Sequence, residues 1–106
     1  MKESIYQKQM RQLLKNAGYD FIEEFRFHPT RKWRFDFVLK PVKTKIAIEV
    51  NGSIWQKGKH TFGKQYEADL EKINTAQLLG WLVFQYTPDT LPNVIKDLNT
   101  LKTTEY

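Results

Sequence analysis

The chain has 106 residues, a length that fits one domain able to bury a modest hydrophobic core, and we expect residues 1–106 to form that single domain. It has no cysteine, which excludes a disulfide framework and a thiolate zinc site. The formal charge of +5 suits a polyanionic partner such as nucleic acid, but it also suits a merely basic soluble protein. No stretch has the apolar length of a membrane span or of a signal peptide, so we expect a cytoplasmic protein without membrane contact.

Helical and strand periodicities alternate along the chain without internal repeats or linkers. Apolar residues at helical spacing indicate amphipathic helices that end at Gly18 and Gly80, and apolar–polar alternation indicates strands. A polar loop, residues 52–63, separates the third strand from the second helix. The predicted elements are a helix at 3–17, strands at 23–28, 33–39 and 45–51, a helix at 64–79, a buried strand at 81–87, and a helix from an N-cap at Thr90 to about residue 101.

The segment from 45–51 through the helix at 64–79 to 81–87 is a strand–helix–strand unit. Such a crossover joins parallel strands with a right-handed connection, whereas the short turns between the earlier strands favour antiparallel pairing. The sequence therefore predicts an α/β fold, a mixed β-sheet flanked by helices in the order α-β-β-β-α-β-α.

Two acids, Asp36 and Glu49, interrupt the apolar rhythm of adjacent strands. A turn of two or four residues between these strands places the acids directly opposite each other, with Cβ atoms about 5 Å apart. An odd-length turn would place them on a diagonal, within reach of one ion. Like charges opposite each other destabilise a sheet, whereas Mg²⁺ prefers one or two carboxylates together with waters and phosphate. The acids are therefore a candidate metal site, and the alternative is that they are solvated or paired with Arg34 and Lys45.

Four sequence segments surround these acids in a recognisable order: RFDFVL, KIAIEVNGSIW, GKHTFGKQYEADLEKIN and LLGWLVFQYTP. Over about residues 25–88 they resemble the PD-(D/E)XK nuclease superfamily, and more narrowly the small phage and bacterial endonucleases related to very-short-patch-repair endonucleases (the DUF559-like group). The resemblance implies a restriction-endonuclease-like core and a prokaryotic or phage-encoded enzyme that hydrolyses DNA phosphodiester bonds with Mg²⁺ or Mn²⁺. It also implies that Asp36 and Glu49 are catalytic metal ligands, with the Val50 carbonyl as a backbone ligand.

The chain departs from the superfamily pattern at Asn51, where a catalytic lysine is common. The first candidate to replace that lysine is Lys72, at the edge of the apolar stripe of its helix; its alternative role is a solvated lysine paired with Asp69. A second candidate is His60 in the polar loop, either as a general acid or base or as a phosphate contact; its alternative role is polar surface.

Further candidates lie on the first helix and beside the proposed metal site. The resemblance also implies that an acid or amide on the first helix, Glu3 or Gln7, contacts the waters of the metal, although a glutamate at a helix start also serves simply to offset the helix dipole. Aromatic residues such as Trp55 can stack on bases. The candidate nucleic-acid-binding residues are Arg31, Lys32, Arg34, Trp55, Lys57, Lys59, His60 and Lys64.

Two other functions fit the same sequence. One is a catalytically inactive nucleic-acid-binding module, for which Asn51 would be the sign, and the other is a small protein-interaction factor with incidental charge. The sequence leaves open whether a nuclease of this type acts on nicked, branched, mismatched or intact duplex DNA, or on RNA. A nuclease domain this small is expected to cut both strands of a duplex only as a homodimer.

Overall fold

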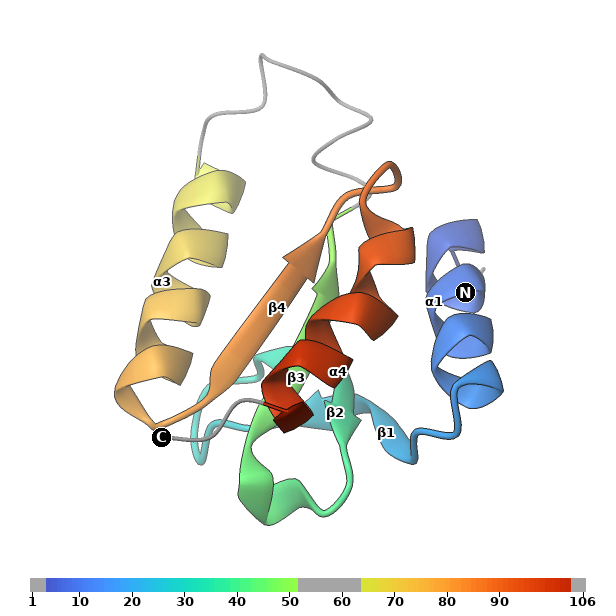
Figure 1. The fold of residues 1–106 in the computed structure, drawn as a ribbon. Coiled ribbons are helices and arrows are strands. Elements are labelled where there is room, and N and C mark those ends of the chain that lie inside the picture. Colours follow the sequence, from blue (N-terminus) through green and yellow to red (C-terminus); the bar gives the residue numbers. More distant parts are fainter. Residues whose placement is uncertain (1–3, 52–63, 104–106) are drawn as a thin grey trace.

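The computed structural model describes residues 4–51 and 64–103 of the chain (Figure 1). The predicted order of helices and strands is confirmed. The first strand is shifted by two residues, to Phe21–Arg26, and the last helix begins at Val94, after a 3-10 turn, instead of directly after Thr90. The elements are α1 (Ile5–Asn16), β1 (Phe21–Arg26), β2 (Arg34–Leu39), the 3-10 turn η1 (Val42–Thr44), β3 (Ile46–Val50), α3 (Lys64–Leu78), β4 (Leu82–Tyr86), the 3-10 turn η3 (Leu91–Asn93) and α4 (Val94–Thr103).

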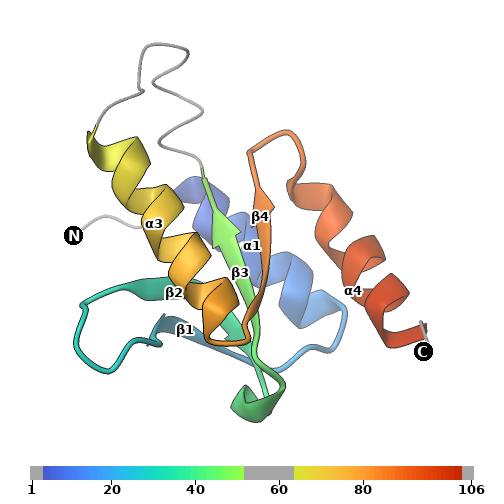
Figure 2. The same cartoon turned by 90° about the vertical axis from the view of Figure 1, so that its left-hand side faces the viewer.

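The four strands form one mixed sheet in the order β1-β2-β3-β4. Neighbours β1 and β2, and β2 and β3, are antiparallel, while β3 and β4 are parallel. Helix α3 covers one face of the sheet, and α1 and α4 cover the other (Figures 1 and 2). This is the predicted α/β architecture. Among the described helices, none has the length and apolar character needed to cross a membrane.

Each face of the sheet has its own hydrophobic core, and the strand β2 contributes to both. Phe37 and Leu39 pack toward α1 and α4, whereas Phe35 packs with Val38 toward α3. Strict alternation predicts Phe35 on the same face as Phe37, and that prediction is wrong. The change of face coincides with an irregular point of the β1–β2 pairing: Glu24 has a φ of 53°, and the pair that it would form with Asp36 is missing, although the register is the same on both sides.

Helix ends follow the glycines as predicted, but the N-cap at Thr90 differs. Gly18 and Gly80 follow α1 and α3 with φ values of 84° and 91°, the left-handed conformation typical of a helix C-terminus. Thr90 precedes η3, yet its hydroxyl accepts a hydrogen bond from the Thr87 N–H (2.9 Å) and caps no helical amide. It therefore stabilises the turn after β4.

Gly80→Ala is expected to lower the free energy of unfolding by about 1 kcal/mol or more. An alanine Cβ would have room, since the nearest atoms, in Lys45, lie 3.7 and 3.8 Å away, so the cost comes from the positive φ. Urea unfolding would measure this change. The matched control Gln77→Ala, at an exposed helical position, should change stability by less than about 0.5 kcal/mol; an equal loss in both variants would contradict the backbone explanation.

Candidate active site

Strands β2 and β3 hold the two acids face to face through reciprocal hydrogen bonds. The Asp36 N–H donates to Glu49 Oε2 (2.8 Å), and the Val50 N–H donates to Asp36 Oδ2 (2.7 Å). The observed pairs Phe37↔Ile48 and Val38↔Ala47 have the register predicted to place Asp36 opposite Glu49. Each carboxylate is thus fixed by the main chain of the partner strand, so the geometry of the pair is determined by the sheet itself.

The alternative interpretations of the acid pair do not match its surroundings. Glu49 is only 8% exposed, and Asp36 is half-buried, so the acids do not lie on a solvated face. Lys45 donates instead to the Leu79 carbonyl at the end of α3 (2.8 Å). Arg34 is exposed and forms no ion pair with any residue in the described ranges. The positive partner of the acids comes from elsewhere.

That partner is Lys72, on the face of α3 that packs on the sheet. Its Nζ forms an ion pair with Glu49 Oε1, and the two side chains are 15% and 10% exposed. The same Nζ lies 5.6 Å from the centre of the Phe35 ring, so the change of face in β2 provides an aromatic neighbour for the ammonium group. Lys72 is therefore a buried partner of the acid pair and not the solvated lysine of the alternative interpretation.

Burial controls the electrostatics of this cluster. Burial and the Asp36 charge together raise the pKa of Glu49 to about 7, against the opposing effect of Lys72. Burial also raises the pKa of Asp36, although the Val50 N–H and Lys72 oppose this shift. With both acids ionised, one ammonium group balances one of two carboxylates. The remaining negative charge is one that a cation can neutralise.

The donor set suits a hard divalent cation. Two carboxylates with bound waters and a substrate phosphate are a usual arrangement for Mg²⁺, whereas an all-protein cage needs more ligands. Across residues 4–51 and 64–103 there is no cluster of three or more histidine, cysteine, aspartate and glutamate side chains able to hold a metal. The site therefore fits a cation that takes Asp36 and Glu49 as its side-chain ligands. A role for the Val50 carbonyl stays a prediction.

Asn51, the residue in the lysine position of the motif, is held by strand β4. Its main-chain N–H donates to the Tyr86 carbonyl (2.7 Å), and its side-chain Nδ2 donates to Gln85 Oε1 (3.1 Å). Gln85 lies beside Glu49 in the β3–β4 register, so it extends the row of polar side chains across the sheet. Sequence reasoning misses Gln85 because the apolar character of residues 81–87 indicates only a buried strand. The sequence feature that could have identified Gln85 is that it is a glutamine within an otherwise apolar strand.

Among the described residues, the predicted catalytic residue Gln7 is not joined to this cluster. Gln7 is half-buried on α1, and it takes no part in the hydrogen bonds that join Asp36, Glu49 and Lys72 in the described part of the chain. The remaining predictions lie outside the described residues: Glu3, Trp55, Lys57, Lys59 and His60.

The basic residues before β2 differ from one another. Arg31 forms an ion pair with Glu71 on α3 (3.2 Å), and its guanidinium lies 3.8 Å from the centre of the Trp33 ring. Lys32 and Arg34 are exposed, as is Lys64 at the start of α3. Of the predicted nucleic-acid-binding residues Arg31, Lys32 and Arg34, Arg31 is thus already bound to other side chains of the protein.

One solved structure shares this fold over almost its whole length. The chain is similar to the catalytic domain of the homing endonuclease I-Bth0305I, with a TM-score of 0.62 and 21% sequence identity, over 94% of this chain and 92% of that one. No protein-family model matches the chain, and no curated protein sequence matches it. The likeness establishes a fold in common with an endonuclease catalytic domain.

Proposed function

We propose that this chain is a divalent-metal-dependent endonuclease of the PD-(D/E)XK type, which hydrolyses DNA phosphodiester bonds with a metal held by Asp36 and Glu49. The observation that carries the proposal is the buried cluster in which two opposed carboxylates share a single lysine, Lys72. Like charges at this spacing cost stability, and a function that needs them explains why they are placed together. The fold in common with a homing endonuclease catalytic domain and the charge of +5 support the assignment.

A bound Mg²⁺ or Mn²⁺ would supply Lewis-acid polarisation of the phosphate and an activated water. The chain itself holds the two carboxylates beside each other through the N–H groups of Asp36 and Val50. Lys72 presents an ammonium group beside Glu49, where it can orient the attacking water and stabilise the negative charge that develops on the phosphate. It takes the role that Asn51 cannot, because an amide carries no charge.

Further residues are assigned to DNA contacts because of their place in the chain relative to the acid pair. We assign Lys32 and Arg34 to phosphate contacts, because both are exposed beside the strand that carries Asp36. The predicted phosphate contacts at Lys57, Lys59, His60 and Lys64, and stacking by Trp55, belong to the same proposal, as do roles for Glu3 or Gln7 near the metal waters. Two copies of the chain would be required to cut both strands of a duplex.

A supercoiled-plasmid assay tests the proposal directly. The wild-type protein is expected to convert supercoiled plasmid to nicked product with Mg²⁺ and to leave it intact with EDTA. Glu49→Gln should reduce this rate at least about a hundredfold, because loss of groups that only support metal ligands already costs 10- to 100-fold.

Two results would contradict the proposal. Equal cleavage by wild type and Glu49→Gln would trace the activity to a contaminant. Wild-type protein that binds DNA but leaves plasmid intact at every metal concentration would indicate the inactive binding module instead.

A further inference from the structure

Two arginines lie directly opposite each other at the loop end of the β1–β2 hairpin. Arg26 pairs with Arg34 in the antiparallel register, and both side chains are exposed. Like charges in this arrangement repel each other and weaken a strand pair. Neither arginine forms a salt bridge with another residue among those the structure describes; the Arg26 Nε donates only to the Arg31 carbonyl (3.4 Å). The hairpin thus keeps a repulsive pair for which the described residues provide no acidic partner, and the long Arg26–Arg31 hydrogen bond is the contact that offsets it.

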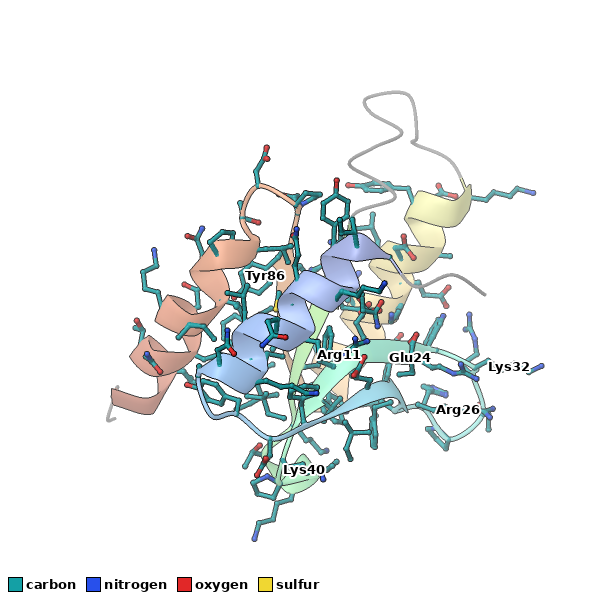
Figure 3. All side chains as sticks on the ribbon, turned by 90° about the vertical axis from the view of Figure 1, so that its right-hand side faces the viewer. Arg11, Glu24, Arg26, Lys32, Lys40 and Tyr86 are labelled. Atoms are coloured by element: carbon teal, nitrogen blue, oxygen red, sulfur yellow. The ribbon has the colours of Figure 1, made fainter. Side chains whose placement is uncertain are left out.

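The nearby charges leave this pair positive. Glu24 precedes Arg26 by two residues and is exposed, yet it forms no ion pair with either arginine. Lys32 adds a third positive charge, and Figure 3 shows Arg26 and Lys32 projecting at the same end of the molecule, away from Lys40. These three basic side chains, Arg26, Lys32 and Arg34, are called the hairpin cluster below.

The loop between the two arginines has a defined shape. His28 Nδ1 accepts hydrogen bonds from the main-chain N–H groups of Thr30 (3.2 Å) and Arg31 (2.9 Å). The Arg31 guanidinium covers the Trp33 ring, and Phe27 packs against that ring at 6.2 Å with nearly parallel planes. Because these contacts fix the loop, the hairpin cluster is presented in a preorganised arrangement, which lowers the entropy cost of binding.

A phosphodiester is the anion that this arrangement suits. A guanidinium fork donates two hydrogen bonds to a phosphate, and opposed arginines with Cβ atoms about 5 Å apart can share one anion. Arg34 precedes Asp36 by two residues on β2, roughly 6–7 Å along the strand. The rise of about 3.4 Å per nucleotide is measured along the DNA axis, and successive phosphates of a strand lie about twice as far apart, so an anion at the arginines would be the phosphate next to the one at the acid pair.

We propose that Arg26 and Arg34 form a phosphate-binding pair for the backbone of duplex DNA, with Lys32 as an additional contact. The inference rests on the proposed nuclease function and adds to it a binding residue, Arg26, that the sequence does not single out. The arginine pair destabilises the free hairpin and is compensated by the phosphate of the bound substrate. Recognition at this position is independent of base sequence, since the contacts go to the backbone.

Fluorescence anisotropy with a short duplex in EDTA, across a series of salt concentrations, tests the pair without cleavage. The variant Arg26→Gln/Arg34→Gln is expected to bind at least about tenfold more weakly, and the slope of log affinity against log salt should fall by about 1, the value for the one phosphate that the pair no longer neutralises. The control Lys43→Gln/Lys96→Gln removes the same charge from exposed positions on η1 and α4 and should retain the wild-type slope. The thermal unfolding midpoint of the arginine variant should equal or exceed that of wild type, because a repulsive pair is removed.

Four results would overturn the inference, and a fifth would refute the nuclease function alone. A wild-type slope in the arginine variant, or an equal loss in the lysine control, would exclude a specific phosphate site. A lower unfolding midpoint with unchanged affinity would assign the arginines to the structure of the hairpin. Tighter wild-type binding to an RNA duplex would move the substrate from DNA to RNA. In the fifth result, the wild type binds DNA without ever cleaving plasmid, while the arginine variant loses that affinity. This pair of results would support the phosphate site and refute only the nuclease function.

Discussion

Asp36→Asn is expected to remove Mg²⁺-dependent cleavage, to below about a hundredth of the wild-type rate, while it stabilises the metal-free protein. The substitution keeps an acceptor for the Val50 N–H and leaves the Glu49–Lys72 ion pair electrically balanced. It removes one of two carboxylates that repel each other in a buried site. At pH 8 the free energy of unfolding should rise by about 1 kcal/mol or more, the equivalent of one unit of pKa. Plasmid nicking and urea unfolding measure the two effects.

The pH dependence of stability provides a second measurement on the same variant. In the wild type the pKa of Glu49 is about 7 in the folded state, against 4.5 for an ordinary glutamate, so the folded protein binds the proton more tightly. The resulting stabilisation is complete below pH 4.5 and is lost as the pH rises through about 7. Its upper bound is about 3 kcal/mol, and lowering the pH from 8 to 6 should recover part of it.

In Asp36→Asn this pH dependence should be smaller, because the Asp36 charge is one of the causes that raise the pKa of Glu49. The control Asp20→Asn, at a position outside the cluster, should behave as wild type in both assays. A loss of stability in Asp36→Asn at pH 8 would mean that the acid pair contributes to folding, and it would contradict the view that the pair is kept for function.

The acid pair can be predicted from the sequence because it depends on local rules. Any connection with an even number of residues places Asp36 opposite Glu49; the observed connection, residues 40–45, has six residues instead of the predicted two or four and gives the same register. Helical periodicity likewise places Lys72 at the edge of the buried stripe of its helix. These predictions concern single elements and their immediate neighbours, where periodicity and chain length are sufficient.

Contacts that depend on an irregular backbone or on distant segments cannot be predicted in the same way. The change of face at Phe35 lies beside the left-handed conformation of Glu24, and no residue pattern indicates that conformation because glutamate rarely adopts it. The Asn51–Gln85 hydrogen bond joins residues 34 apart in the chain. The hairpin cluster depends on the β1–β2 register, because that register places Arg26 opposite Arg34.

Lys72→Met is expected to reduce the rate of cleavage by about 10²- to 10³-fold and to destabilise the metal-free protein by about 3 kcal/mol. Methionine retains the length and the apolar contact with Phe35, but it removes the ammonium group that offsets the charge of two buried carboxylates. The loss of stability is opposite in sign to the gain expected for Asp36→Asn, although both variants lose activity. Mg²⁺ should therefore raise the unfolding midpoint of Lys72→Met more than that of wild type, because the cation replaces the missing positive charge.

Thermal unfolding with and without Mg²⁺, at pH 8, measures this difference. Lys72→Arg keeps the charge and serves as the folded comparison: it should retain most of the metal-free stability, while its bulkier planar group still lowers the cleavage rate. Lys96→Met, at an exposed site on α4, controls for the loss of a lysine elsewhere and should retain both activity and stability. Equal Mg²⁺-induced shifts in wild type and Lys72→Met would show that the cation does not bind beside Glu49. Full activity in Lys72→Met would transfer the charge-stabilising role to another residue, and the opposed acids would then act without the lysine that now balances them.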